Sequence, residues 1–136
     1  MRRAFMSTSR PAKLLDAIGS SIRVERSFSL ADTKAFAELS GDTNPIHTTS
    51  ETAIVHGILL SSLFSMLVGT HYPGSVYVSQ NLQFKKPVYL NEPIRATVQV
   101  IRIRSAVNVL VCQTTIQKKD GEIAVDGEAQ VLIKKL

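Results

Sequence analysis

Two residues that can exchange protons lie close together in one short, turn-rich segment of this sequence. Asp42 carries a carboxylate, and His47 carries an imidazole, the side chain that most readily exchanges protons near neutral pH. Between them Pro45 restricts the backbone, while Gly41 and Asn44 favour turns. A carboxylate and an imidazole held in one compact loop can both reach a single water molecule. The segment therefore predicts general acid–base chemistry on water.

The dipeptide His56-Gly57 is a second candidate, because it stands at the start of a strongly apolar segment. The first amides of a helix have no acceptor within the helix, so they can bind an oxyanion. Glycine lets a substrate carbonyl approach the backbone closely, which makes Gly57 the candidate donor. For His56 we expect a structural role, with its ring hydrogen-bonded inside the core.

Simpler explanations exist for the same residues. Asp42 could be a turn residue or a helix cap, and a lone histidine such as His47 is more often structural than catalytic. Ser61 and Ser62 could bond back to the carbonyls of their own helix. The sequence contains no Gly-rich phosphate loop, no G-x-S-x-G elbow and no metal-ligand spacing such as H-E-x-x-H. The residues alone therefore leave catalytic and structural interpretations of the loop open.

The candidate residues lie around two predicted helices. Ser29 is a suitable N-cap with Asp32 at N3, and the helix that follows should end near Gly41. Residues 54–70 form a second helical pattern that is apolar on nearly all sides, which is typical of a buried helix. The candidate loop connects these two helices.

The rest of the chain alternates in the manner of β-strands. Within the segment that ends at Arg104, the apolar phase changes between Val100 and Ile101, which predicts a β-bulge or a strand whose buried face changes along its length. Such a sheet can wrap one apolar helix, which gives an α+β fold with a long, curved antiparallel sheet around a central buried helix. An open sheet leaves an edge strand, so we expect pairing with a second copy. The expected strands are residues 22–28, 75–87, 92–104, 107–118 and 122–134.

Composition limits the other classes of function. The chain has 136 residues and a net charge of +5, with 44% hydrophobic residues, as expected for one globular domain, placed at residues 19–136. No apolar run approaches the roughly 20 residues that span a bilayer. The single cysteine, Cys112, excludes a disulfide within the chain and a cysteine-based zinc cluster, and should pack as a small apolar residue.

The net positive charge comes mostly from the N-terminus, where four basic residues and no acidic residue precede Asp16. This distribution argues against a nucleic-acid-binding face. Residues 1–18 are rich in arginine and serine and lack a secretory apolar core, which favours a mitochondrial or plastid targeting segment over a plain basic tail. The basic residues concerned are Arg2, Arg3, Arg10 and Lys13.

The candidate loop resembles a known family. Residues 36–47, which read FAELSGDTNPIH, resemble the signature of the (R)-specific enoyl-CoA hydratase, or MaoC-like, hot-dog family, and residues 54–59 resemble its second block. Residues 69–74 and 79–88 extend the resemblance, which covers roughly residues 20–134. With the basic N-terminus, the chain is most similar to the mitochondrial 3-hydroxyacyl-thioester dehydratase type 2 group.

The resemblance implies a hot-dog fold and a hydro-lyase. It implies that Asp42 and His47 hold the water that adds to a trans-2-enoyl thioester of CoA or acyl carrier protein, giving the (R)-3-hydroxyacyl product. Gly57 would stabilise the enolate oxygen, and Asn44 and Ser62 would orient the catalytic pair. It also implies a homodimer in the mitochondrial matrix, with no metal or other cofactor.

Two features depart from the family pattern. Only residues 48–53 separate His47 from Ile54, whereas the family usually carries about three more helical turns' worth of residues there. Thr49 stands where the family commonly has an aspartate. The missing residues help to wall the acyl pocket in relatives, so their absence bears on substrate length, on closure of the pocket and on activity.

Other functions of the same fold are alternatives to the hydratase. A thioesterase would need a carboxylate on the central helix, and residues 56–70 contain neither aspartate nor glutamate. The short segment after His47 favours a non-catalytic acyl-binding or assembly subunit as the main alternative. A plain scaffold dimer is the remaining one.

Overall fold

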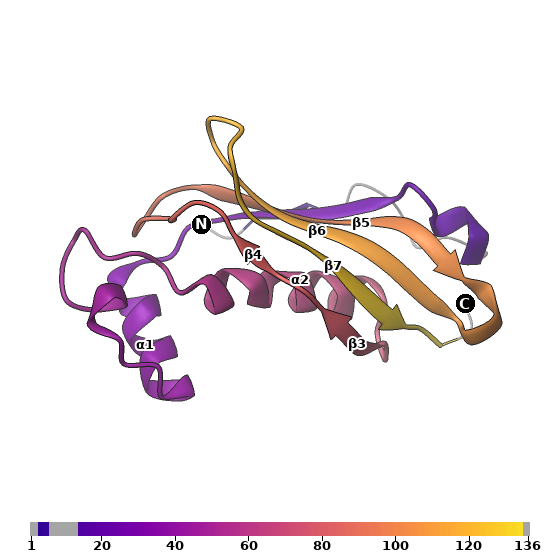
Figure 1. Ribbon diagram of the computed structural model, residues 1–136, viewed down its shortest axis with the longest axis horizontal. Helices are drawn as coiled ribbons and strands as arrows, with labels where there is room; N and C mark the ends of the chain where they lie inside the picture. The colour runs from indigo at the N-terminus through magenta and orange to yellow at the C-terminus, as the bar shows by residue number, and fades with distance from the viewer. Residues whose placement is uncertain (1–2, 6–13, 135–136) are drawn as a thin grey trace.

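A long antiparallel sheet covers one face of a single central helix (Figure 1). The computed structural model describes residues 3–5 and 14–134. Three short 3₁₀ helices occupy Leu14–Ala17, Pro45–His47 and Ser105–Val107. The α-helices are α1 (Leu30–Ser40) and α2 (Gly57–His71). The strands are β1 (Arg3–Phe5), β2 (Ser21–Arg26), β3 (Val76–Gln80), β4 (Gln83–Phe84), β5 (Ile94–Arg104), β6 (Val109–Lys118) and β7 (Ile123–Leu132).

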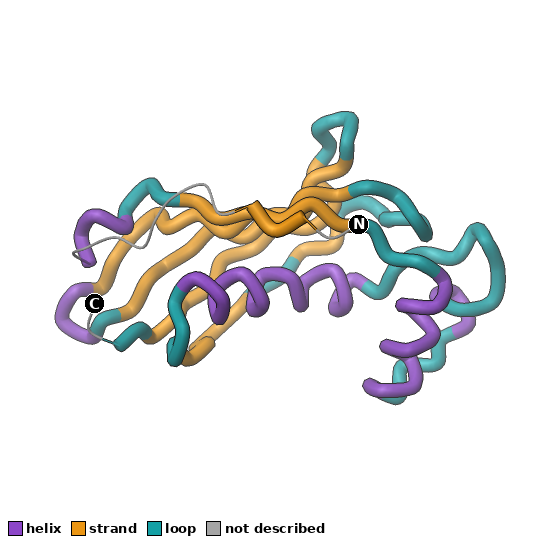
Figure 2. Tube along the Cα trace, turned by 180° about the vertical axis from the view of Figure 1, so that it is seen from behind, coloured by secondary structure: helices purple, strands orange, loops and turns teal. Residues whose placement is uncertain are grey.

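The strand order is β1-β2-β5-β6-β7-β3, with β4 also paired to β7, and all pairs are antiparallel. Helix α2 runs along one face of this sheet, whereas α1 lies beyond its end (Figure 2). The core forms between α2 and the sheet, where Leu60, Phe64 and Leu67 of α2 are buried together with Leu110 and Ile116 of β6. This arrangement confirms the predicted hot-dog fold.

The capping residues in the sequence predicted both ends of α1 correctly. The Ser29 hydroxyl accepts from the Asp32 N–H while the Asp32 carboxylate accepts from the Ser29 N–H, forming the predicted capping box. Gly41 ends the helix in the left-handed conformation at φ 83°, which glycine adopts without steric cost. The chain therefore turns sharply just before Asp42.

Two predicted boundaries are wrong. Helix α2 begins at Gly57 rather than at residue 54, because Ile54 bridges to Tyr89 and the Val55 N–H donates to the Val88 carbonyl. Apolar periodicity does not distinguish such a buried extended segment from a helix turn. The predicted strand 75–87 is likewise broken into β3 and β4, and β3 contains a bulge next to Tyr77.

The remaining strand predictions are confirmed within a few residues. The register of β5 against β6 shifts between Val100 and Arg102, where the change of apolar phase predicted a bulge. Cys112 is buried in β6, and burial raises the pKa of its thiol to about 12, as expected for a residue that packs as a small apolar side chain. Among the described residues, no helix is long and apolar enough to cross a membrane.

The packed core extends further toward the N-terminus than residue 19, the predicted start of the domain. Ala17 is fully buried in the core, and the Gly19 N–H donates to the Val100 carbonyl. Residues 3–5 pair with β2. The predicted targeting segment, residues 1–18, otherwise lies largely outside the described residues, and its role stays a prediction.

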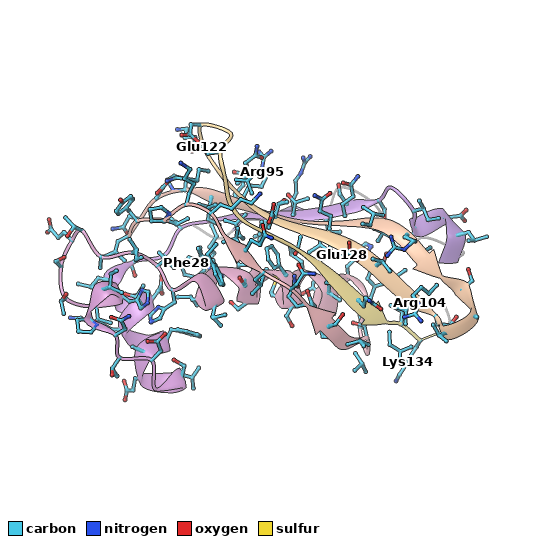
Figure 3. All side chains as sticks on the ribbon, in the orientation of Figure 1. Phe28, Arg95, Arg104, Glu122, Glu128 and Lys134 are labelled. Atoms are coloured by element: carbon cyan, nitrogen blue, oxygen red, sulfur yellow. The ribbon has the colours of Figure 1, made fainter. Side chains whose placement is uncertain are left out.

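Charged side chains occupy the face of the sheet opposite α2, where Arg95 projects outward, and the loop that ends at Glu122 extends beyond the sheet (Figure 3). Arg95 pairs with Glu25 at 2.6 Å, and Arg102 lies 3.6 Å from Glu128. These pairs are exposed to solvent, so each contributes little to stability. They leave the apolar face of the sheet to α2.

We expect Gly127→Ala to lower the free energy of unfolding by about 1–3 kcal/mol, the usual cost of overpacking. A Cβ at this position of β7 would overlap the main-chain carbonyl of Asn81, which cannot move away as a side chain could. Urea denaturation measures the change. Gly69→Ala is the matched control, because nothing lies within 4 Å of its Cβ position and α2 should gain about 0.5–1 kcal/mol. Equal effects of the two substitutions would contradict this assignment.

Candidate active site

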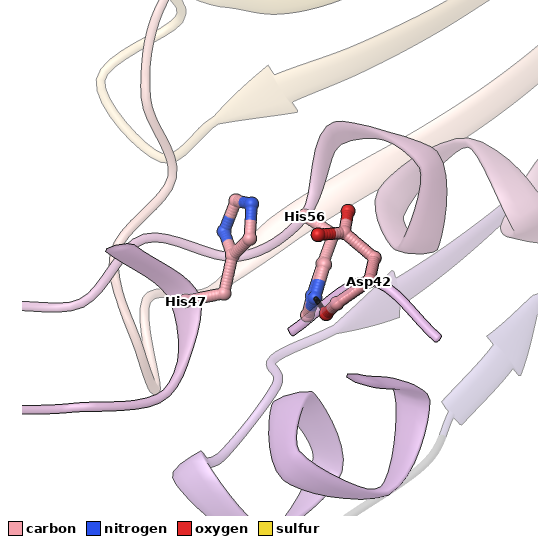
Figure 4. Close-up of side chains that lie close together, drawn as sticks. All are labelled: Asp42, His47 and His56. Carbon is pink, nitrogen blue, oxygen red and sulfur yellow. Dashed lines mark hydrogen bonds between the residues drawn. The ribbon is translucent and has the colours of Figure 1, made fainter. Parts of the chain in front are cut away.

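The loop between α1 and α2 brings three side chains together (Figure 4). One carboxylate oxygen of Asp42 and one ring nitrogen each of His47 and His56 all lie within 4.8 Å of one another. Asp42 follows the end of α1, His47 ends a 3₁₀ helix, and His56 is the N-cap of α2. The predicted pair is therefore assembled within one chain, with a third titratable residue beside it.

Hydrogen bonds to residues two positions away hold Asp42 in place. The Asp42 N–H donates to the Ser40 hydroxyl at 3.1 Å, and the Asn44 N–H donates to Asp42 Oδ1 at 3.3 Å. The Asn44 side chain in turn accepts from the Ile46 N–H at 3.3 Å, which caps the 3₁₀ helix that carries His47. Asn44 thus contacts the carboxylate through its backbone and caps the 3₁₀ helix of His47 through its side chain. The Asp42 side chain itself is exposed to solvent.

His47 has one ring nitrogen committed to the backbone. Nδ1 lies 2.8 Å from the Ile54 carbonyl oxygen, which can only accept, so Nδ1 carries the proton. In the neutral ring Nε2 is then an unprotonated acceptor, as a general base requires. The Ile54 N–H also donates to the Ile46 carbonyl at 3.0 Å. The short segment 48–53 therefore closes directly beside His47 and fixes its ring.

A cavity of about 330 Å³ connects His47 with the start of α2. Gly57 is the first residue of α2, so its N–H lacks an acceptor within the helix. A Cβ at Gly57 would overlap the ring of Phe84, which shows how closely this aromatic side chain approaches the backbone. The other lining residues are Ile54, Val55, Ile58, Leu60, Lys85, Lys86, Pro87, Val88 and Val125. The cavity is thus apolar along most of its wall and polar at His47, at the Gly57 backbone and at the two lysines.

His56 is almost fully buried, with 1% of its surface exposed. Its ring stacks on His47, with centroids 3.9 Å apart, and meets Phe36 edge to face at 4.8 Å. Its Nε2 lies 3.4 Å from the Asp42 main-chain oxygen. Burial lowers the pKa of His56 below 6.5, and the nearby His47 lowers it further, against opposing effects of the Asp42 carbonyl and carboxylate. His56 is therefore neutral at neutral pH.

The lowered pKa of His56 should make the protein less stable in mild acid. The unfolded chain then binds a proton near pH 6.5 that the folded chain does not bind, so stability is fully present above this pH and is lost as the pH falls. We expect the wild type to lose more unfolding free energy between pH 7.5 and pH 5 than His56→Phe does. Urea titrations at both pH values measure the difference. Parallel losses in the two proteins would contradict the assignment.

In this chain the Ser62 hydroxyl does not bond to the predicted pair, Asp42 and His47. Its hydroxyl donates to the Leu59 carbonyl at 2.6 Å, which is the back-bonding alternative considered from the sequence. Ser61 donates in the same way to the Gly57 carbonyl at 2.7 Å. The supporting role predicted for Ser62 is thus not visible within one subunit.

The three-residue cluster is poorly arranged for a metal ion. The rings of His47 and His56 are stacked, with an angle of 25° between their planes, so their lone pairs lie in two nearly parallel planes and converge poorly on one ion. His47 Nδ1 is also occupied by the Ile54 carbonyl. The arrangement suits proton transfer better than coordination.

Two contributors to the site were missed from the sequence. The Ile54 carbonyl, which sets the tautomer of His47, carries no signal in a residue type. Phe84 stands in the block of residues 79–88 that supported the family resemblance, but only the fold places it against Gly57. His56 was assigned a structural role, and its contact with both members of the pair was not foreseen.

Comparison with known proteins gives the same family as the resemblance seen in the sequence. Residues 15–122 match the model of the MaoC like domain. The mitochondrial 3-hydroxyacyl-[acyl-carrier-protein] dehydratase of Arabidopsis thaliana is 39% identical over 145 aligned positions, which cover 98% of this chain and 86% of that protein. The alignment is longer than the chain, so the relative carries residues that have no counterpart here.

Bacterial relatives are equally similar. The (R)-specific enoyl-CoA hydratase of Aeromonas caviae is 40% identical over 124 positions, covering 84% of this chain and 92% of that protein. A solved structure described as the (R)-hydratase from A. caviae involved in PHA biosynthesis superimposes with a TM-score of 0.83 at 38% identity, covering 86% of this chain and 96% of that one. The family match spans most of the described residues, including the whole candidate site, and the chain therefore belongs to the MaoC-like domain family.

Proposed function

We propose that this protein reversibly hydrates trans-2-enoyl thioesters to (R)-3-hydroxyacyl thioesters. The observation that carries the proposal is the state of His47. Its Nδ1 is tied to the Ile54 carbonyl, and one of its ring nitrogens lies within 4.8 Å of an Asp42 carboxylate oxygen. The relatives are named as a 3-hydroxyacyl dehydratase and an (R)-specific hydratase, which are the two directions of this one reaction.

In the hydration direction, one water molecule binds between Asp42 and His47. His47 Nε2 accepts a proton from the water as its oxygen bonds to the β-carbon of the substrate. The electron pair of the double bond moves through the α-carbon onto the thioester oxygen, where the Gly57 N–H stabilises the enolate. The acid–base pair then returns the proton to the α-carbon, and dehydration reverses these steps. Because the hydroxyl group comes from the water that the pair holds and the proton returns from the same pair, the addition is expected on one face of the double bond.

The carrier of the acyl chain is CoA or acyl carrier protein, since the relatives are named for both. Lys85 and Lys86 line the cavity, but each is already paired, with Asp126 at 2.8 Å and with Glu122 at 3.5 Å. Their charge is therefore largely compensated, and it gives no strong preference for an acidic carrier. Parallel assays with crotonyl-CoA and crotonyl-acyl carrier protein compare the two carriers directly.

A homodimer belongs to the same proposal. Strand β3 is last in the sheet order, and its Val76 and Val78 are more than half exposed. Ile58, Ser62 and Met66 form an exposed stripe along α2 at intervals of one helical turn. Pairing of two β3 edges would cover these apolar residues, and would bury Ser62 in a position where it can support a site. Light scattering should give the mass of a dimer; a stable monomer would contradict this part.

Mitochondrial localisation is also proposed, on the basic N-terminal residues and on two plant relatives that are named as mitochondrial. The matrix is the compartment proposed. Fusion of residues 1–18 to a fluorescent protein tests this point, and a diffuse cytosolic signal would contradict it.

The activity itself is tested by following loss of the enoyl double bond of crotonyl-CoA together with release of free thiol. Hydration without thiol release is expected. Thiol release would indicate the thioesterase alternative, and tight binding of crotonyl-CoA without turnover would indicate an acyl-binding subunit.

A further inference from the structure

His56 is a buried titratable residue that the proposed mechanism does not use. It contacts both members of the catalytic pair at once, through its ring face with His47 at 3.9 Å and through Nε2 with the Asp42 main-chain oxygen at 3.4 Å. Phe36 of α1 supports the ring edge to face at 4.8 Å. One side chain therefore bridges the end of α1, the 3₁₀ helix of His47 and the start of α2.

The hydrogen bonding of His56 selects one tautomer. The Asp42 carbonyl can only accept, so Nε2 carries the proton and donates it. Nδ1 is then a bare lone pair, and this buried atom has no hydrogen-bond partner among the described residues. The opposite tautomer would bury an unpaired N–H and set two acceptors against each other, which costs more. The structure thus holds the neutral Nε2–H form.

The neutral state of His56 matters to its neighbour. The charged or titratable groups that face it are His47 and Asp42, while Phe36 on α1 is uncharged. A positive charge on His56 would lie 3.9 Å from the ring that must accept a proton during hydration, and it would oppose that step. A neutral, polar ring supports His47 without this repulsion.

A purely structural role would not favour histidine at this position. Burying a ring nitrogen without a partner costs free energy that a phenylalanine ring of similar size would not incur. A residue that is unfavourable for stability but shared between two catalytic side chains is typical of a functional site. We propose, on the basis of the proposed hydratase function, that His56 is a positioning residue that fixes Asp42 and His47 relative to each other.

His56→Phe separates the two roles, because phenylalanine keeps the stack on His47 and on Phe36 but cannot donate to the Asp42 carbonyl. We expect kcat for crotonyl-CoA hydration to fall about 10- to 100-fold, as for a small misplacement of catalytic groups. KM should change little, and the melting temperature should stay equal or rise. His56→Gln keeps a donor near the position of Nε2 and should recover part of the lost kcat. Wild-type kcat in His56→Phe, or a loss of kcat that follows a loss of folded protein, would overturn the inference.

A measurement without turnover keeps this inference distinct from the proposed function. ¹⁵N chemical shifts of the histidine rings report tautomers whether or not the protein is an enzyme. At pH 7.5, His56 is expected as the neutral Nε2–H form, and an Nδ1–H form or an imidazolium would overturn the inference. An inactive wild type that shows the expected tautomer would instead reject the hydratase function, and with it the need for positioning.

Discussion

Asp42→Asn is expected to lower kcat/KM for crotonyl-CoA hydration by roughly 1,000-fold, within the range that general acid–base groups contribute. Asparagine has the same shape, and its side-chain oxygen can still accept the Asn44 N–H that now holds Asp42 Oδ1. Because Asp42 is exposed, the substitution should leave the melting temperature unchanged. The loss of activity would then report the chemistry of the carboxylate, measured by steady-state kinetics.

His47→Asn is the companion variant, since its side-chain amide can still donate to the Ile54 carbonyl while the position of Nε2 is lost. A loss similar to that of Asp42→Asn is expected. The double variant should lose little more than either single variant, because groups that act as a unit have strongly non-additive effects. Activity within tenfold of wild type in either single variant would contradict the assignment of the pair.

Removal of the Gly57 N–H should lower kcat by about 100-fold or more, which is the usual effect of losing one oxyanion donor. Proline removes this hydrogen and is well tolerated at the first position of a helix. His56, with φ −54° and ψ 128°, already has the extended conformation that a residue before proline prefers. The substitution therefore deletes one hydrogen while sparing the start of α2.

The pair of variants must be made in a Phe84→Ala background, because any Cβ at Gly57 would overlap the Phe84 ring. Gly57→Ala in that background keeps the N–H and is the matched control for Gly57→Pro. We expect the 100-fold difference between these two proteins, read from kcat at saturating crotonyl-CoA. Equal kcat values would show that this amide does not bind the enolate oxygen.

Local chemistry in the sequence predicted the parts of the site that depend on neighbouring residues. The cap at Ser29, the left-handed Gly41 and the turn at Asn44 each act over a few positions, so the loop that carries Asp42 and His47 was predictable. The bulge in β5 was likewise visible as a change of phase at Val100. Periodicity of apolar residues gave the central helix and the sheet.

Contacts between distant segments were not predictable in this way. The extended course of Ile54 and Val55 depends on their pairing with residues 88–89. The predicted start of α2 at residue 54 was therefore too early, and the helix begins at Gly57. The approach of Phe84 to Gly57 depends on the pairing of β4 with β7. The same holds for the two contacts of His56, which join residues from both sides of the loop.

The most direct test of the account is hydration of crotonyl-CoA by the purified protein, with the configuration of the 3-hydroxybutyryl-CoA product determined by chiral analysis. The account predicts conversion by the wild type to the (R) product alone, and loss of this conversion in folded Asp42→Asn. No hydration by correctly folded wild-type protein, or an (S) product, would contradict it.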